Sequence, residues 1–498
     1  MLKTPYQSLE DRFRRLDAVS GAQSILHWDM SAMMPSGGAA SRAEQLATLS
    51  SIQHSMITDP ALEDLLDGAE ADLHLTNWQQ ANVREMRRAW IHQAAIDADL
   101  VEALSRACSA SETVWRRARP NNDFKAALPG LEEVLNLSRQ VAEAKSEKLG
   151  VGLYDALLDQ YEPDGRSADI DVIFDDLGAF LPGFLDDVLS RQGQCGAPIP
   201  LEGPFSTDQQ RNLGQTFMTA LGFDFAHGRL DESAHPFCGG TADDVRITTR
   251  YDEADFTGAM MGVLHETGHA LYEQGLPQAW QGQPVGGARG MSLHESQSLL
   301  IEMQACRSQD FLTYAAPILR TAFGTEGDAW QADNLLRHSN RVNKGFIRVD
   351  ADEVTYPAHV ILRYQLEKAA IYGDLKMADL PGAWNDGLQN LLGITPPGDR
   401  EGCLQDIHWY DGAWGYFPTY TLGAMTAAQL FAKAKLDQPD ILPAISQGNF
   451  APLLGWLREH VHAQGSLLST KDLLIEATGE ALNADHFKAH LKARYLSA

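Results

Sequence analysis

Apolar residues recur mainly three and four positions apart along this chain, which is the spacing of one face of an α-helix. Leu9, Phe13 and Leu16 form one such stripe near the start. The segment 77–119 contains neither proline nor glycine, so we expect one or two long helices that end before Pro120. The same spacing predicts a mainly α protein with further helices over 124–148, 168–192, 207–221, 256–275, 291–315, 327–343 and 350–373, and several more near the end.

One segment departs from the helical spacing. Between Asp243 and Tyr251, β-branched residues alternate with polar ones, which is the period of a β-strand. We therefore expect a small sheet just before the helix at 256–275.

The loop at 193–204 is rich in glycine and proline and is the best candidate for a boundary between lobes. A chain of 498 residues exceeds the size at which a single core usually stops growing, about 250–300 residues. We interpret residues 1–498 as one domain, with possible lobes of about 1–195 and 196–498.

Composition and charge narrow the classes of function. With 44% hydrophobic and 21% charged residues, the chain resembles soluble globular proteins. Its net charge of −27 repels nucleic-acid phosphates and anionic membranes. It contains no apolar run of the length of a membrane span and no CxxC pair among its five cysteines, and its charged, amphipathic first segment leads us to expect no signal peptide. We expect a cytoplasmic protein without nucleic-acid or membrane partners.

A metal-binding motif lies inside the helix expected at 256–275. His265-Glu266-Thr267-Gly268-His269 matches H-E-x-x-H, and residues four apart share one helix face, so both imidazoles can bind one ion. Glu266 lies beside that ion and suits a general base. Zn²⁺ is the ion expected for this motif, and Co²⁺ or another divalent ion fits the same donors.

A catalytic zinc site takes three protein ligands, so one more must come from another element. Glu295 follows His269 by 26 residues and is the first candidate; His294 and Glu302 are the alternatives. The apolar neighbours of Glu295 predict a buried helix, and a buried carboxylate requires a partner or a metal.

Five further segments surround this motif in a fixed order. They are His235-Pro236-Phe237, Asp244-Val245-Arg246-Ile247-Thr248, His294-Glu295-Ser296, Ile347-Arg348-Val349-Asp350-Ala351-Asp352 and Gly402-Cys403-Leu404-Gln405-Asp406-Ile407-His408-Trp409. Together with the zinc motif they resemble HPF, DxRxT, HExxH, HES(Q), IRxxAD and GxxQDxHW, the series of the carboxypeptidase Taq family, peptidase family M32. The likeness covers most of the chain.

The resemblance implies a helical gluzincin-type metallocarboxypeptidase with a long groove between two lobes and a small β-sheet beside the metal site. It implies peptide substrates and a homodimer. It also makes His235 and Gln405 candidate substrate contacts. His408 and Tyr420, with Tyr416 as the other tyrosine, lie in segments that resemble the donor-bearing region of related gluzincins; ordinary core packing of these rings is the alternative.

One segment and one single residue depart from the family pattern. Where the family continues HESQS with Arg-Leu-Trp-Glu-Asn, this chain has Leu299-Leu300-Ile301-Glu302-Met303, so a basic and an aromatic side chain are missing beside Glu295. Cys238 follows the HPF segment where a hydroxyl residue is usual. We interpret its thiol as an inert small side chain, with oxidant sensitivity as the alternative.

A carboxypeptidase must bind a free terminal carboxylate, which a guanidinium group holds with two parallel hydrogen bonds. Arg348 and Arg246 are the candidates because each lies in a family motif, and a structural ion pair is the alternative for each. A further polar set at helical spacing predicts a buried network, with a substrate site as the alternative: Glu353, Tyr356, His359 and Arg363.

The sequence therefore predicts a zinc-dependent carboxypeptidase that removes C-terminal residues from short peptides. A helical gluzincin oligopeptidase that cuts internal bonds is one alternative, separated only by the carboxylate anchor. A peptide-binding metalloprotein without turnover is the other. Glu266 beside three metal ligands argues against it, because a structural zinc ion normally has four protein ligands.

Overall fold

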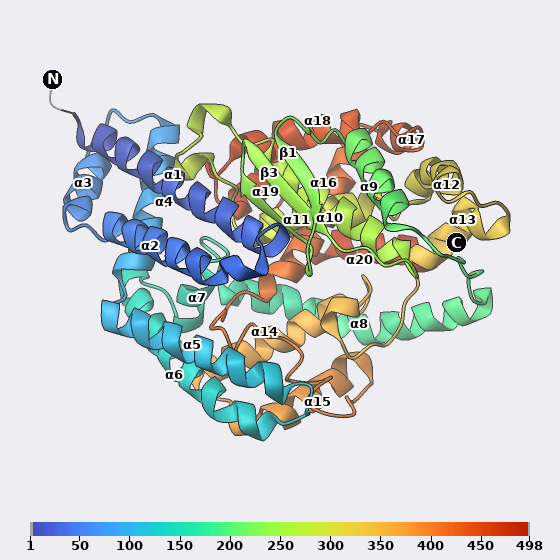
Figure 1. Ribbon diagram of the computed structural model, residues 1–498, viewed down its shortest axis with the longest axis horizontal. Helices are drawn as coiled ribbons and strands as arrows, with labels where there is room; N and C mark the ends of the chain where they lie inside the picture. The colour runs from blue at the N-terminus through green and yellow to red at the C-terminus, as the bar shows by residue number, and fades with distance from the viewer. Residues whose placement is uncertain (1–2, 497–498) are drawn as a thin grey trace.

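The computed structural model describes residues 3–496 and is mainly helical (Figure 1). Within these residues no helix is both long and apolar enough to cross a membrane. The helices are α1 (Pro5–Ala32), α2 (Ala39–Ile57), α3 (Ala61–Glu70), α4 (Asn77–Ala94), α5 (Ala98–Ala118), α6 (Phe124–Leu149), α7 (Leu153–Leu158), α8 (Ser167–Cys195), α9 (Thr207–Leu221), α10 (Phe256–Glu273), α11 (Met291–Leu299), α12 (Gln309–Phe323), α13 (Ala332–Ser339), α14 (Tyr356–Tyr372), α15 (Leu380–Leu392), α16 (Pro418–Asp437), α17 (Ile441–Ile445), α18 (Ala451–His460), α19 (Thr470–Thr478) and α20 (Ala484–Leu496).

The predicted helices are confirmed, with differences at capping and proline positions, and the helix expected over 327–343 extends only from Ala332 to Ser339. The segment 77–119 forms two helices because Asp97 caps α5, accepting a hydrogen bond from the Leu100 amide. The segment 291–315 divides at Ser308, which caps α12 in the same way. The helix expected from 350 starts at Tyr356, with Pro357 in its first turn.

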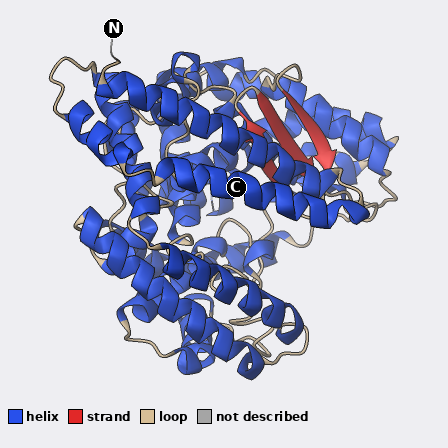
Figure 2. Cartoon of the chain, turned by 60° about the vertical axis from the view of Figure 1, so that its left-hand side comes forward, coloured by secondary structure: helices blue, strands red, loops and turns tan. Residues whose placement is uncertain are grey.

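The predicted strand is confirmed as β3 (Asp244–Thr249), the centre of a three-stranded sheet. The parallel neighbour is β1 (Gly228–Glu232), and the antiparallel neighbour is β2 (Phe237–Thr241). Figure 2 shows this sheet on one side of an otherwise helical body. Val245 and Ile247 enter the hydrophobic core that α10 shares, whereas Arg246 stacks on Trp28 of α1. Because strand residues alternate between faces, Arg246 lies on the face of β3 that is turned away from this core.

Three hydrophobic clusters hold the chain together. The first joins α6, α7, α8, α14, α15 and α20, and the second joins β3, α9 to α12 and α16 to α19. A smaller third cluster joins α1, α3 and α4, with Leu9, Phe13 and Leu16 all buried as their spacing predicts. The first cluster takes residues from both sides of the loop at 193–204, so the units that these cores define are discontinuous in sequence.

Two glycines allow α10 and α16 to pack closely on α11. A Cβ atom at Gly268 of α10 would lie 2.5 Å from the Gln297 carbonyl oxygen. A Cβ atom at Gly423 of α16 would lie 2.8 Å from Cβ of Glu295 and 3.0 Å from the Ser292 carbonyl oxygen. These close approaches fix the helix that carries Glu295 against the helix that carries the H-E-x-x-H motif.

This packing predicts the effect of adding one methyl group to α10. Gly268→Ala should lower the free energy of unfolding by about 1–3 kcal/mol, because backbone atoms of α11 occupy the space of the new Cβ. Gly262→Ala on the same helix is the matched control, since its Cβ would meet only Thr249 Oγ1 at 3.9 Å. Removing that glycine should be neutral or stabilising by up to about 1 kcal/mol. Denaturant unfolding in the presence of a chelator measures both, and equal effects would contradict the packing argument.

Candidate metal and substrate site

Three potential metal ligands converge between α10 and α11. One donor atom from each of His265, His269 and Glu295 lies within 4.8 Å of the other two. Nε2 of His265 is 3.9 Å and Nε2 of His269 is 3.4 Å from Oε2 of Glu295. The three side chains keep 22%, 13% and 16% of their surface exposed, so the group is enclosed but accessible. Two imidazole nitrogens and one carboxylate oxygen are the donor set of a catalytic zinc site, and the residues therefore fit such an ion.

Each histidine of this group has an outer partner on its second nitrogen. Nδ1 of His265 lies 3.0 Å from Oε2 of Glu302, whose other oxygen accepts a hydrogen bond from Arg307 Nη2 at 2.8 Å. With Nε2 of His265 directed at Glu295, the Nδ1–H donates to Glu302. Glu302 therefore lies behind a ligand histidine, as an orienting carboxylate.

His294 has the equivalent place behind His269. The two Nδ1 atoms are 2.6 Å apart, and Nε2 of His294 is 2.8 Å from Oε1 of Glu273. When Nε2 of His269 is free to bind an ion, its Nδ1–H donates to His294, which in turn donates to Glu273. Of the three residues considered for the third ligand, only Glu295 lies within the convergent group.

Burial and neighbouring charges shape the protonation of the carboxyl groups here. Burial raises the pKa of Glu295, but the His265 charge and the hydrogen bond from His269 outweigh it and bring the pKa down to about 2. Burial raises the pKa of Glu266 to about 7, against the opposing charge of His265. Glu266 is thus a buried carboxyl group beside the ligands rather than one of them.

The departure from the family pattern leaves these contacts in place. Leu299, Leu300 and Ile301 are buried in the second hydrophobic cluster. Residues Leu300–Ala305 form a π-helix, with the Cys306 amide donating to the Ile301 carbonyl at 2.8 Å. This π-helix brings Glu302 to His265. No periodicity in the sequence predicted the π-helix.

The environment of Cys238 agrees with the interpretation of an inert side chain. Burial raises the pKa of the thiol well above its ordinary value, and the charges of Glu266 and Glu273 act in the same direction. A protonated thiol is a poor nucleophile and reacts slowly with oxidants.

A second charged cluster surrounds Asp406. Its Oδ1 accepts from Arg348 Nη2 at 2.7 Å and Nε at 3.2 Å, and its Oδ2 accepts from Arg363 Nε at 2.7 Å. Arg348 Nη1 also donates to the Tyr356 hydroxyl at 2.9 Å. Arg348 is 5% and Arg363 0% exposed. Two buried guanidinium groups share one carboxylate, so the cluster carries one positive charge that no acid within it neutralises.

The predicted aromatic donors lie against this cluster. The His408 ring is 4.5 Å from that of Phe417, and the rings of Tyr416 and Tyr420 are 5.2 Å apart. The Arg348 guanidinium lies 5.1 Å from the Tyr420 ring centre. Burial, followed by the charges of Arg348 and the neighbouring guanidinium, lowers the pKa of His408 to about 4 despite the opposing charge of Asp406. Nδ1 of this neutral histidine is buried and has no hydrogen-bond partner within residues 3–496.

The group around Glu295 and the Asp406 cluster act on the same tyrosines. Burial raises the pKa of Tyr356, Tyr416 and Tyr420, and in each case the charge of Glu295 adds to the shift. The charge of Arg348 opposes the shift in all three. The site lies where the second hydrophobic cluster, with α10 and α11, meets the first.

Three further predicted substrate residues have other surroundings. Arg246 donates to both oxygens of Asp244, at 2.9 and 2.6 Å, and stacks 4.4 Å from Trp28. Gln405 accepts from the Arg348 amide at 2.8 Å and donates to main-chain carbonyls, so its amide group braces the loop that carries Arg348. His235 is exposed in the turn between β1 and β2.

The predicted buried network divides between two places. Tyr356 and Arg363 join the Asp406 cluster, and His359 lies at 3.2 Å from the Gly345 carbonyl oxygen. Glu353 belongs to a separate cluster near α20. Sequence reasoning placed Arg363 in a network without identifying it as the second partner of Asp406; its spacing on α14 was the only signal.

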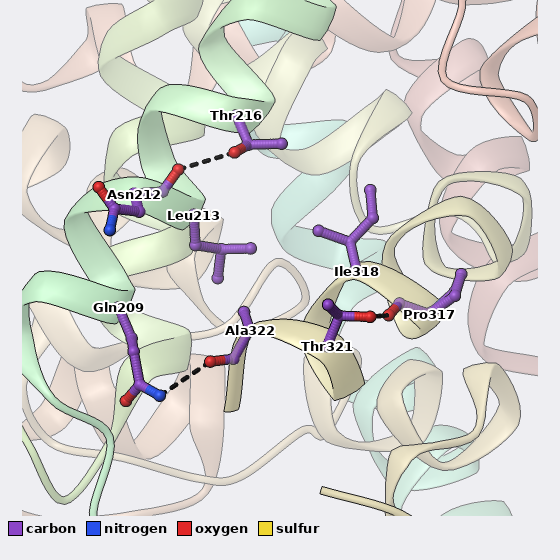
Figure 3. A pocket seen from close by; sticks show the side chains of 8 residues that line it. All are labelled: Gln209, Asn212, Leu213, Thr216, Pro317, Ile318, Thr321 and Ala322. Atoms are coloured by element: carbon purple, nitrogen blue, oxygen red, sulfur yellow. Dashed lines mark hydrogen bonds between the residues drawn. The ribbon is translucent and has the colours of Figure 1, made fainter. Parts of the chain in front are cut away.

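A cavity of about 480 Å³ between α9 and α12 offers no comparable chemistry (Figure 3). Its polar side chains satisfy helix carbonyls: Thr216 bonds to Asn212, Thr321 to Pro317 and Gln209 to Ala322. No titratable side chain lines it.

Comparison with known proteins agrees with this geometry. The profile of the family described as carboxypeptidase Taq (M32) metallopeptidase matches residues 8–495. Thermostable carboxypeptidase 1 of Thermus thermophilus is 38% identical and covers 98% of each chain. The solved structure of Trypanosoma cruzi metallocarboxypeptidase 1 superposes with a TM-score of 0.97 at 40% identity over 99% of both chains. The M32 carboxypeptidase of Deinococcus radiodurans gives 0.93 at 35% identity over 99% of this chain and 98% of that one.

Substitution of a proposed metal ligand and of the partner behind a ligand should lower metal affinity to different extents. Glu295→Ala removes a donor atom and should leave the purified protein without bound metal. Glu302→Ala removes only the partner of His265, so metal affinity should fall by about 10- to 100-fold while binding persists. Elemental analysis and chelator competition measure both. If Glu302→Ala empties the site and Glu295→Ala does not, the ligand assignment is wrong.

Proposed function

Because the chain belongs to the carboxypeptidase Taq (M32) family of metallopeptidases, we propose that His265, His269 and Glu295 hold the metal ion with which it removes C-terminal residues from peptides. The chain is a metallocarboxypeptidase, and we propose Zn²⁺ as the ion, with Co²⁺ or another divalent ion able to replace it. The observation that carries the residue assignment is the convergence of three donor atoms within 4.8 Å, close to a buried cluster with surplus positive charge.

We assign the proton transfers of peptide hydrolysis to Glu266. A divalent ion at this site, when bound, polarises the peptide carbonyl and lowers the pKa of a water molecule. The Glu266 carboxyl group, adjacent to His265 and 8% exposed, takes the proton of the attacking water and delivers it to the departing amine. Its buried setting keeps the pKa near neutrality, which suits both steps.

Tyr420 and His408 are the proposed donors to the oxyanion that forms on the scissile carbonyl, with Tyr416 as the other candidate. Raised tyrosine pKa values keep the hydroxyl groups protonated and able to donate. The neutral His408 ring carries one N–H group. Each therefore supplies a hydrogen bond without adding a charge.

Arg348 is the proposed partner of the substrate's terminal carboxylate. The Asp406 cluster carries one surplus positive charge, and an entering carboxylate neutralises it. We assign Arg246 the structural alternative, since Asp244, which accepts from its Nε and Nη2 on the far face of β3, balances its charge. Gln405 is a positioning residue that holds the main chain of Arg348, and His235 stays a predicted substrate contact.

Two alternative functions are a peptide-binding protein without turnover and an oligopeptidase that cuts internal bonds. The family assignment favours an enzyme over a peptide-binding protein without turnover. An oligopeptidase would use the same metal group but would not require the charge surplus around Arg348. We further propose short peptides as substrates and a cytoplasmic location. We also propose a homodimer, which a measurement of molecular size in solution tests directly.

The role of Glu266 predicts that binding and chemistry can be separated. Glu266→Gln preserves the shape of the side chain but removes the base, so turnover should fall by about two to four orders of magnitude. Metal content should remain that of the parent enzyme, because Glu266 is not a ligand. Parallel elemental analysis and peptide assays check this, and retention of more than about a tenth of turnover would remove Glu266 from its role.

The role of Arg348 predicts a difference between two classes of peptide. Peptides with an amidated C-terminus should be poor substrates, since they lack the charge that the Asp406 cluster binds. Arg348→Ala should lower kcat/KM for free-acid peptides by about 2–4 kcal/mol and hardly change the low rate on amides. Arg348→Lys should recover only part of the loss, because lysine lacks the planar fork.

Arg246→Ala is the matched control for this experiment. It removes a guanidinium that is also paired with an aspartate and stacked on an aromatic ring. Because this pair is more exposed than the Arg348–Asp406 pair, the stability cost should be smaller, and the preference for free acids should remain. An equal proportional loss on acids and amides in Arg348→Ala would show a structural role for Arg348. Efficient cleavage of amides by the parent enzyme would favour the oligopeptidase.

A further inference from the structure

A buried polar cluster behind the metal group has no place in the reaction described above. It centres on Glu353, which accepts hydrogen bonds from Gln304 Nε2 at 3.3 Å, His490 Nε2 at 2.8 Å, Arg494 Nη1 at 3.0 Å and the Tyr495 hydroxyl at 3.1 Å. Glu353 is 5% and Gln304 3% exposed. Three of the four donors belong to α20, the last helix of the chain. The cluster therefore joins the end of the chain to residue 304.

Arg494 also binds the main chain of the π-helical segment. Its Nη1 donates to the Met303 carbonyl and its Nη2 to the Gln304 carbonyl at 3.3 Å. The last carbonyls of a helix lack partners within the helix, so a guanidinium fork at this point satisfies groups that would otherwise be unpaired in the interior. Oε2 of Glu353 accepts from the same Nη1 atom at 3.0 Å.

The two carbonyls directly follow the residue that orients a metal ligand. Glu302 lies between Nδ1 of His265, at 3.0 Å, and Nη2 of Arg307, at 2.8 Å. Its position depends on where the irregular backbone at Leu300–Ala305 lies. Arg494 fixes that backbone one and two residues further along.

We propose that Arg494, held by Glu353, is a positioning residue for the metal centre. It fixes the π-helical segment so that Glu302 meets Nδ1 of His265 and turns the imidazole toward the ion. The inference rests on the proposed function, because it requires His265 to be a ligand. Arg494 touches neither the ligand group nor the Asp406 cluster, and it acts only through Glu302.

A purely structural role, attaching α20 to the body of the protein, is the competing explanation. The chain offers a matched control for it. Lys488, on the same helix, donates to Asp176 of α8 and so attaches α20 to an element that carries no metal contact. Lys488→Met and Arg494→Met each remove one cationic attachment of α20, but only the second releases the π-helical segment.

The experiment measures Zn²⁺ affinity of the full-length variants by chelator competition, together with the visible spectrum of the Co²⁺-substituted proteins. Arg494→Met should weaken Zn²⁺ binding by about tenfold and alter the Co²⁺ spectrum, as expected when an outer partner of a ligand is displaced. Lys488→Met should change affinity by less than about twofold and leave the spectrum as in the parent. Equal effects of the two variants, or parental affinity in Arg494→Met, would overturn the proposal.

Arg494→Lys keeps the proposal testable if the methionine variant does not fold. A lysine ammonium cannot reach both carbonyls and Glu353 with fork geometry, so affinity should fall by about threefold. Unchanged affinity in this variant would also overturn the role of the guanidinium fork.

A double substitution tests whether Arg494 acts through Glu302. Once Glu302→Gln has removed the carboxylate, adding Arg494→Met should change Zn²⁺ affinity by less than about twofold, because the two residues act along one route. Additive losses would show that Arg494 reaches the metal by another route.

His265→Ala separates this inference from the ligand assignment on which it rests. Loss of metal in that variant, with unchanged affinity in Arg494→Met, would overturn only the positioning role. Retention of metal in His265→Ala would overturn the ligand assignment of His265 and the positioning role with it.

Discussion

A carboxylate enclosed between packed helices is stable only beside opposite charge, and Glu295 is such a carboxylate. Gly268 and Gly423 let α10 and α16 close on α11, so the Glu295 side chain lies against helix backbone on one side and two imidazoles on the other. As metal ligands the two imidazoles are neutral, and they then do not neutralise the carboxylate. A divalent ion does, and its binding recovers the cost of removing the acid from water. The close helix packing and the metal chemistry are therefore one constraint.

The Asp406 cluster also contains an unbalanced buried charge, but this charge is positive. Two guanidinium groups with one carboxylate leave a positive charge in a buried position, which costs free energy until an anion arrives. The terminal carboxylate of a peptide is such an anion. Because the charge of Glu295 reaches the tyrosines around Arg348, the proposed metal ligands and the proposed anchor act on the same side chains. In the function that we propose, this arrangement selects the end of a peptide by charge.

Short-range sequence patterns could predict the parts of this site that depend on helix periodicity. The four-residue spacing of His265 and His269, and the buried character of the helix with Glu295, follow from the chain alone. The strand at Asp244–Thr249 was predicted from its alternation, whereas β1 and β2 were not, since both are short and β2 carries two glycines. Contacts between residues far apart in sequence could not be predicted. Arg363 with Asp406, and Arg494 with the segment at 303–304, pair through tertiary packing that no local pattern encodes.

The π-helical segment explains why the departure at Leu299-Leu300-Ile301 leaves the metal group intact. These three side chains pack in the second hydrophobic cluster. The polar contact of the segment with His265 is made by Glu302. Arg307 donates to Glu302, and Arg494 donates to the Met303 and Gln304 carbonyls; both come from outside the HES motif. In the positioning role that we propose, these guanidinium groups fix the segment from its far end, in place of a basic residue next to Glu295. Motif positions beside a ligand can vary where tertiary contacts fix the backbone, and in that case the constraint on the metal lies in residues that no motif contains.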